Sequence, residues 1–384
     1  MNRRGFLASL LLAVTTSAAG CGSVAGQATA PSRPATPPSL ATSLTTATGT
    51  WAVAVMGGSA ASHNNFWQLF VRPAGASTWR LATPPGVASN GGLVLTGLAS
   101  GSVLAGFRPS QDLAYSPLAT TKDNGKAWSP GLLDAGLADL PGALAADPAS
   151  GRLLALLSNG TTDISGNGGT RWTRLVTHRE LATSPAGTRC QLGTVTAAAF
   201  SPSGQPWVGA DCGRPGTAGI FSQASRTWGL TGPALPAAYA HQAITVLRLT
   251  TTGRTTAALL AAGTGPAERL LAAWSADGGA HWALSAPLPL NGATLTSASS
   301  GPGSSLAITL SDRHAAAITT ATRPWRPLPL LPPGTATLAP APSGGWEALA
   351  VHGTRLTIWQ AAPGAPVWSS AQIIKVPVPY GSSG

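Results

Sequence analysis

Short apolar segments alternate with polar turns along most of the chain, a pattern that predicts β-strands rather than helices. In one stretch, residues 195–200 and 206–210 are strand candidates on either side of a turn at 201–205, and 219–223 adds a third strand. The same order recurs in three further stretches, at 143–157, 306–319 and 346–359. The sequence therefore predicts an all-β chain that uses one supersecondary unit several times.

Tryptophan marks the repeat. Seven Trp residues each follow a turn-like stretch and precede a short apolar or Pro-containing segment, and successive members are 43 to 56 residues apart: Trp79, Trp128, Trp172, Trp228, Trp282, Trp325 and Trp368. Four short strands in a unit of about 40 to 50 residues are typical of one blade of a β-propeller. Residues 48–380 then hold seven four-stranded antiparallel blades. A β-sandwich rich in Trp would not explain the shared register.

Three of the turns before a Trp follow the pattern Ser/Thr-x-Asp-x-Gly-x-x-Trp, with Asn replacing Asp in one of them. A short side-chain oxygen at the third position can accept backbone N–H groups inside a tight hairpin, and Gly can take the left-handed conformation. The hydroxyl binds the other side of the loop, and Trp fills space between neighbouring sheets. The residues are Thr121, Asp123, Gly125 and Trp128, then Ser165, Asn167, Gly169 and Trp172, then Ser275, Asp277, Gly279 and Trp282.

These turns resemble the Asp-box, or BNR repeat, of sialidase-like and sortilin-like propellers. The resemblance implies that the boxes lie on outer hairpins of the blades, away from the central pocket, and that their role is structural. The other four turns, such as those ending at Trp228 and Trp325, keep only the Trp. Photosystem assembly factors of cyanobacteria and plastids resemble the same plan in fold.

The amino terminus predicts export. Arg3 and Arg4 precede the apolar run Phe6–Val14, and the segment 2–7 resembles a twin-arginine export motif. Ala18-Ala19-Gly20-Cys21 resembles a bacterial lipobox, with Ala18 where Leu is more frequent. This implies a signal peptide at 1–20 and an acylated Cys21. A secreted protein cut near the same small residues is the alternative.

The segment 21–47 differs from the rest of the chain. It is rich in Ala, Pro, Ser and Thr, and four Pro residues between 31 and 38 disfavour regular helix. We expect a disordered, lipidated linker at 21–47 that holds a propeller at 48–380 outside the membrane.

Two cysteines remain after the lipid acceptor. Cys190 and Cys212 flank the first two strands of the fourth unit, so in an exported protein we expect a disulfide between them. Two buried thiols are the alternative. The six His residues show no metal-ligand spacing, and the sequence predicts neither a metal nor a cofactor.

Charge is sparse but unbalanced. Charged residues form 9% of the chain, and 23 basic against 12 acidic residues give a formal net charge of +11. No run of five basic residues occurs, so nucleic-acid binding is not predicted. Outside a membrane, the positive charge would favour anionic lipid headgroups, sugar acids or an acidic protein face. Scattered Arg that only keeps the surface soluble is an equal alternative.

Catalysis has one weak candidate. Sialidases of this fold hold a carboxylate with three Arg residues, the first in an Arg-Ile-Pro motif, and use a Tyr–Glu pair with an Asp. Phe107-Arg108-Pro109 approaches that motif without the Ile, which makes Arg108 a weak ligand candidate. No Tyr stands near any of the three Glu in sequence. No catalytic residue is therefore predicted.

These observations favour a monomeric lipoprotein on the outer face of the cell membrane. Its propeller would be a non-catalytic binding or assembly module for a protein or glycan ligand, bound at the central opening or on one face. The alternative is a sialidase-like glycoside hydrolase. That alternative requires Arg108 to meet two further Arg residues beside a Tyr–Glu pair.

Overall fold

The computed structural model describes residues 38–57, 65–86, 91–98, 101–108, 114–147 and 149–377. All of these residues belong to one compact unit, 33–384. The predicted signal peptide, Cys21 and the linker as far as residue 37 lie outside the described residues.

The described chain consists almost entirely of antiparallel strands, and each group of four consecutive strands forms one sheet or part of one. The first three sheets are β1 (Thr42–Thr46), β2 (Gly49–Gly57), β3 (Asn65–Pro73) and β4 (Arg80–Leu81); β5 (Gly92–Gly97), β6 (Val103–Arg108), β7 (Ser116–Thr121) and β8 (Ser129–Leu133); and β9 (Leu144–Ala146), β10 (Leu153–Leu156), β11 (Thr162–Ser165) and β12 (Thr173–Val176).

A nine-stranded sheet follows, and it contains two such groups. These are β13 (Leu192–Phe200), β14 (Pro206–Cys212), β15 (Gly219–Ala224) and β16 (Thr227–Leu230); and β17 (Ile244–Thr252), β18 (Thr255–Ala262), β19 (Arg269–Ser275), β20 (Ala283–Leu284) and the short β21 (Leu288–Pro289). Main-chain strand pairing joins the two groups at Asp211 with Thr245 and at Cys212 with Ile244.

The last two sheets complete the series. They are β22 (Leu295–Ser300), β23 (Leu306–Leu310), β24 (Ala315–Ile318) and β25 (Arg326–Pro327); and β26 (Thr335–Pro340), β27 (Trp346–His352), β28 (Arg355–Ala361) and β29 (Ser369–Lys375). The helices are α1 (His178–Thr183) and α2 (Pro185–Cys190), with 3-10 turns η2 (Ala237–Tyr239), η3 (Gly265–Ala267) and η4 (Pro302–Ser304).

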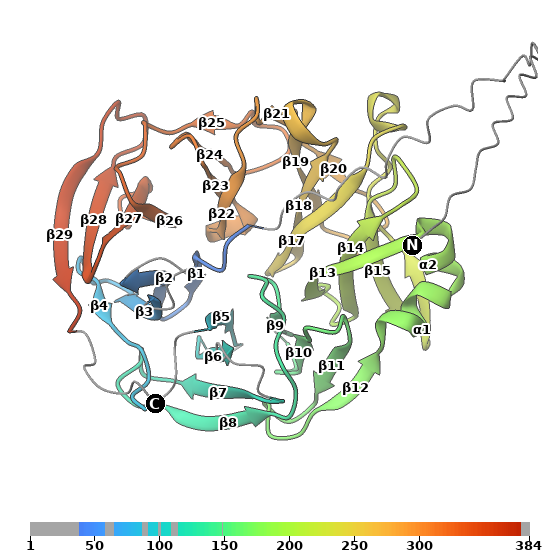
Figure 1. Ribbon diagram of the computed structural model, residues 1–384, viewed down its shortest axis with the longest axis horizontal. Coiled ribbons are helices and arrows are strands. Elements are labelled where there is room, and N and C mark those ends of the chain that lie inside the picture. The colour runs from blue at the N-terminus through green and yellow to red at the C-terminus, as the bar shows by residue number, and fades with distance from the viewer. Residues whose placement is uncertain are drawn as a thin grey trace, which may run out of the picture. The chain divides into compact units, whose positions relative to one another are not determined.

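The sheets stand as successive sectors around a common centre (Figure 1). The first strand of each group is innermost: β1 contacts β5 and β26, β5 contacts β9, β9 contacts β13, and β13 contacts β17. The fourth strands, such as β8, β12 and β29, lie at the rim (Figure 1). This arrangement confirms the predicted all-β propeller of seven four-stranded antiparallel blades.

Two features differ from the sequence expectation. β1 spans Thr42–Thr46, so residues 42–46, which composition assigned to the linker, form the innermost strand of blade one, before the expected propeller start at residue 48. Composition failed because small hydroxyl residues suit a strand whose side chains bond to neighbouring strands. The helices α1 and α2 also interrupt the strand pattern between blades three and four.

Among the described residues, side-chain contacts hold blade seven against blade one, and no strand of one blade pairs with the sheet of the other. The guanidinium of Arg72 on β3 forms a buried ion pair with Glu347 on β27. Trp79 donates its Nε1–H to the same carboxylate at 2.9 Å. The main chain of Trp79 also forms two hydrogen bonds of 2.7 Å with the side-chain amide of Gln372 on β29.

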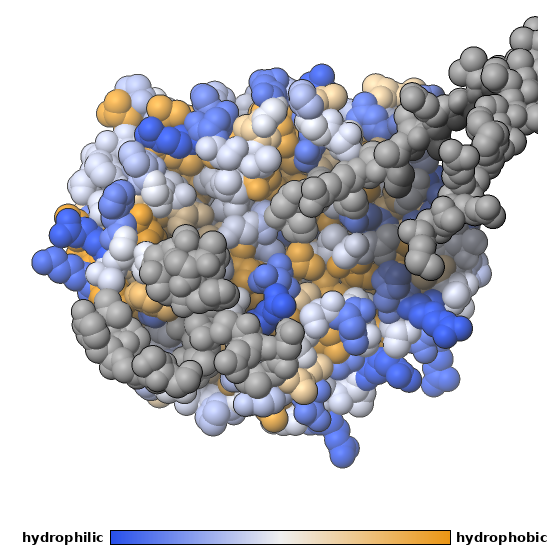
Figure 2. Space-filling view, viewed as in Figure 1, coloured by the Kyte–Doolittle hydropathy of each residue, from blue (hydrophilic) through white to orange (hydrophobic). Residues whose placement is uncertain are grey.

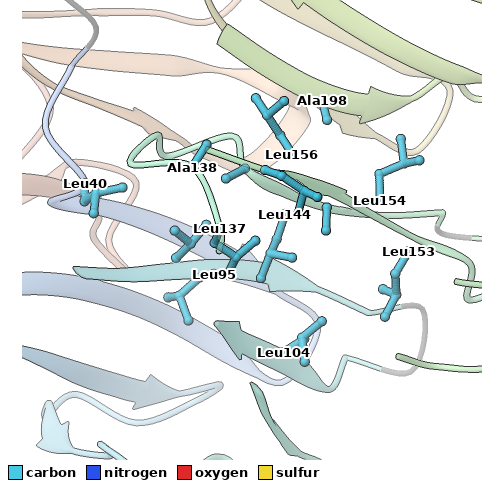
Figure 3. Close-up of a cluster of buried hydrophobic side chains, with 14 of the residues drawn as sticks. Leu40, Leu95, Leu104, Leu137, Ala138, Leu144, Leu153, Leu154, Leu156 and Ala198 are labelled. Atoms are coloured by element: carbon cyan, nitrogen blue, oxygen red, sulfur yellow. The ribbon is translucent and has the colours of Figure 1, made fainter. Parts of the chain in front are cut away.

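Apolar residues fill the space between adjacent blades. Figure 3 shows side chains of β5, β6, β9, β10 and β13, with those of the loop before β9, gathered in one cluster. Leu40, which immediately precedes blade one, belongs to the same cluster. Burial of small residues such as Ala198 lets the inner strands approach closely. Further apolar clusters lie elsewhere in the ring, so neighbouring blades pack through hydrophobic interfaces.

Candidate functional site

The three predicted boxes lie on outer hairpins. Residues 121–128 connect β7 to β8, residues 165–172 connect β11 to β12, and residues 275–282 connect β19 to β20. In the first box, the Thr121 hydroxyl accepts the Gly125 N–H at 2.8 Å, and one Asp123 oxygen accepts the N–H groups of Lys126 and Ala127 at 3.0 and 2.9 Å. Gly125 has a φ of +79°, as such a turn requires.

The other two boxes repeat this bonding. The Ser165 hydroxyl accepts the Gly169 N–H at 3.0 Å, and the Ser275 hydroxyl accepts the Gly279 N–H at 2.8 Å. The third-position oxygens of Asn167 and Asp277 accept the N–H groups of residues 171 and 281, each at 3.0 Å. These side-chain oxygens bond to main-chain N–H groups of their own turn, so they stabilise the turn.

The repeated Trp residues connect neighbouring blades. Trp282, Trp325 and Trp368 donate their Nε1–H groups to main-chain carbonyls just beyond the outer strand of the preceding blade, at 2.7 to 3.1 Å. Trp128 instead packs edge-on against Trp51 of blade one, with ring centroids 6.2 Å apart. The indoles therefore act as spacers between sheets.

The disulfide between Cys190 and Cys212 is present, as predicted. It ties the end of α2 to the end of β14, beside the main-chain pairing of blades four and five. The helix α1 that precedes α2 begins with a capping box in which Thr177 and Glu180 bind each other's main-chain N–H groups. The disulfide and cap fix this long connection against blade four.

Arg108, the weak ligand candidate, forms an ion pair within the chain. Its guanidinium pairs with Asp139 at 3.1 Å, and both side chains are partly exposed. Of the residues named for a Tyr–Glu pair, Glu347 bonds to Arg72, Trp79 and Gln360, and Glu180 bonds to Thr177. No hydrogen bond joins a Tyr to a Glu within the described ranges, and Tyr380 lies outside them.

A pocket opens at the centre of the ring, at the carboxyl ends of the innermost strands. Its volume is about 310 Å³. Parts of β1, β5, β9, β13, β17 and β22 line it, so six of the seven blades contribute. We call it the axial pocket, lined by residues 44–47, 95–98, 101, 141–142, 144–146, 198–200, 248–253 and 300–301.

Buried hydroxyl groups connect the inner strands at the axis. Thr42 donates to the Ala298 carbonyl at 2.8 Å, which links β1 to β22. Ser299 bonds to Thr337 at 2.9 Å, which links β22 to β26. Thr196 donates to the Val246 carbonyl, which links β13 to β17. The axis is therefore polar although the walls between blades are apolar.

Arg248 is the one charged residue that lines the axial pocket. A β-bulge between Val246 and Arg248 shifts the register of β17 against β18 and turns this side chain toward the axis. Its Nη1 donates to the Thr42 hydroxyl at 2.9 Å and to the Ala298 carbonyl at 2.8 Å. Its Nε has no acceptor.

The charge of Arg248 is buried without a counter-ion. The residue is 7% exposed, and none of the ion pairs between described residues includes it. Burial lowers the pKa of its guanidinium to about 10, so the side chain stays protonated at neutral pH. A shift of that size corresponds to roughly 3 kcal/mol of unfavourable burial. A group held at such a cost is a candidate for ligand binding.

The described ranges show few other sites. They contain no cluster of three or more His, Cys, Asp or Glu side chains suited to a metal. With six residues each, α1 and α2 fall far short of bilayer-spanning length, and no other described helix reaches it. On the face drawn in Figure 2, most of the strongly hydrophilic residues lie toward the rim, and a further group lies near the middle.

Solved structures with a similar fold are distant in sequence. A GH74 xyloglucanase from Xanthomonas campestris aligns with a TM-score of 0.53 at 13% identity, over 83% of this chain and 51% of that one. A protein from Lactobacillus plantarum gives 0.54 at 12%, over 86% and 97%. A putative 6-phosphogluconolactonase from Bacteroides uniformis gives 0.52 at 13%, over 85% and 97%.

The likeness shows the fold alone. No known protein family matches the sequence, and a comparison with curated proteins gives no match. The chain spans about half the length of the xyloglucanase.

Sequence reasoning missed Arg248. A signal was present, because this Arg interrupts an otherwise apolar and β-branched run, Ile244–Thr252, with three Thr at its end. A charge in the first strand of a propeller unit points toward the axis or into a blade interface. The sequence pattern of this strand alone does not distinguish these two directions.

Proposed function

We propose that this chain is a monomeric lipoprotein anchored through Cys21 at the outer face of the cell membrane. Its propeller acts as a non-catalytic module that binds a protein or glycan ligand in the axial pocket. We also propose that it is an Asp-box propeller, since three of its outer hairpins carry the motif with matching hydrogen bonds.

The observation that carries the binding proposal is the uncompensated guanidinium of Arg248 in the axial pocket. A pocket of about 310 Å³ lies at the low end of the range for small ligands or the end of a larger one. Its lining holds no carboxylate, imidazole, thiol or phenol that would act as a general acid, base or nucleophile. The arrangement suits recognition.

A photo-crosslinking residue tests the site in cells that express the full chain. Thr252 is exposed and lines the pocket, whereas Thr173 is exposed on the outermost strand of blade three. We expect a discrete adduct from position 252 and none from position 173. Equal labelling at both positions, or hydrolysis of a fluorogenic sialoside by the purified protein, would contradict the proposal.

The anchor has a separate test. Metabolic labelling with a fatty acid should mark the full chain, and Cys21→Ala should remove the label and release the protein into the medium. Retention of the unlabelled variant at the membrane would count against the lipid anchor.

A further inference from the structure

Arg248 carries unused hydrogen-bonding capacity. An arginine has five N–H donors, and the two hydrogen bonds of this one both start at Nη1. Nε has no acceptor, and Nη2 makes no hydrogen bond to any residue in the described ranges. Nε is enclosed by protein atoms, so Nη2 is the donor left for a ligand, and a hydrogen bond from a charged guanidinium to a carboxylate is a strong one.

The remainder of the lining combines apolar side chains with hydroxyl groups. Leu44, Leu95, Leu144, Phe200 and Leu249 contribute larger side chains, and the other positions are Ala, Gly, Pro, Leu, Thr or Ser. Asn, Gln, Asp and Glu are missing from this lining, so no carboxylate or amide oxygen of the lining competes for Arg248. The body of a small ligand would fit against the Leu and Phe side chains.

We propose that the axial pocket binds the carboxylate of a small ligand, with the Nη2 end of the Arg248 guanidinium as the carboxylate receptor. This inference deepens the proposed function and rests on it. The bonds from Nη1 to β1 and β22 hold the guanidinium in place before the ligand arrives. The carboxylate supplies the missing counter-charge in a water-poor site, where such a pair is strongest.

Two sources share this chemistry, a free organic acid and the carboxyl terminus of a peptide. The test uses calorimetry on the full mature chain with N-acetyl-leucine, its neutral amide, and a tetrapeptide of three Ala and a terminal Leu in acid and amide forms. We expect each acid to bind at least about tenfold more tightly than its amide. A tetrapeptide acid that binds more tightly than N-acetyl-leucine identifies a peptide end as the source, and the reverse order identifies a free acid.

Variants assign the effect to Arg248. Arg248→Gln should weaken binding of the acids by about tenfold or more and leave the weak binding of the amides unchanged. Arg254 is an exposed residue of the same β17–β18 hairpin, so Arg254→Gln is the matched control and should change the binding of neither the acids nor the amides. If Arg248→Gln fails to fold, Thr250→Trp fills the pocket, keeps the guanidinium and should abolish acid binding.

Two results would overturn the inference: equal binding of acid and amide, or unchanged acid binding by Arg248→Gln. If these occur while the crosslink at Thr252 persists, the carboxylate inference fails alone. If the crosslink is absent as well, the proposed binding function fails with it.

Discussion

The buried pair between Arg72 and Glu347 should contribute more to stability than any exposed ion pair, because it closes the ring. Glu347→Gln keeps the shape of the side chain and removes its charge. Arg72 is 5% exposed, and it would retain its bonds to the Pro340 carbonyl and the Thr50 hydroxyl but lose its counter-ion. The amide NH₂ would also face the donors of Arg72, Trp79 or Gln360.

The size of the effect follows from burial. Glu347 is fully buried, and burial raises the pKa of its carboxyl above the ordinary value, while the Arg72 guanidinium partly offsets that rise. Removing one partner of a buried pair costs about 3 to 5 kcal/mol. The strands run from Thr42 to Lys375. An unfolding entropy of about 2.1 cal/mol/K per residue over roughly 330 residues turns this cost into a Tm fall of about 4 to 7 °C.

Differential scanning calorimetry on the full chain measures this shift, with two matched variants. Arg108→Gln breaks the exposed pair with Asp139 and should change the free energy of unfolding by less than about 1 kcal/mol. The double substitution Arg72→Met with Glu347→Leu removes both charges and should recover much of the lost stability. A Tm for Glu347→Gln that matches Arg108→Gln would refute the closure argument.

Three further predictions concern the turns and the disulfide. Ser275→Ala removes the acceptor for the Gly279 N–H and should cost about 1 kcal/mol in denaturant unfolding, whereas Thr173→Ala on the exposed strand should be neutral. In the same box, the His281 main-chain N–H and imidazole lower the pKa of Asp277 to about 2. The stabilising contribution of this carboxylate is therefore complete above the unfolded pKa of 3.8 and is lost as pH falls through 2. An NMR titration that gives an ordinary pKa for Asp277 would contradict this. Replacing Cys190 and Cys212 by Ala opens a link between residues 22 apart and should cost roughly 3 kcal/mol, and an unchanged Tm would exclude that contribution.

The strands and blade order were predictable because they depend on local signals. An apolar run, a turn and a second apolar run fix a hairpin with little help from the remainder of the chain, as at 195–210. The Trp positions added a longer period, and the hydrogen bonds of Trp282, Trp325 and Trp368 to preceding blades explain why that period follows the blades. The cysteine pairing followed from the count of two in a chain that its amino terminus predicts to be exported.

The axial pocket was not predictable in the same way, because its parts come from six blades. Arg248 meets Thr42 across 206 residues of sequence, and no local pattern encodes that meeting. β1 was missed for a related reason: its Thr and Ser residues resemble linker composition until their partners on β22 are known. The contact between Glu347 and Arg72, which are 275 residues apart, was not predictable for the same reason.

The two buried arginines differ in a way that separates structure from function. Arg72 is held by Glu347, so its burial is balanced and its role is to close the ring. Arg248 has equally little exposure but no acid partner among the described residues, and stability alone gives no reason to keep a lone guanidinium at the axis. Because the apolar walls between blades supply the stability of the fold, the axis can carry this unfavourable charge. We therefore expect a ligand to bring the missing negative charge to Arg248.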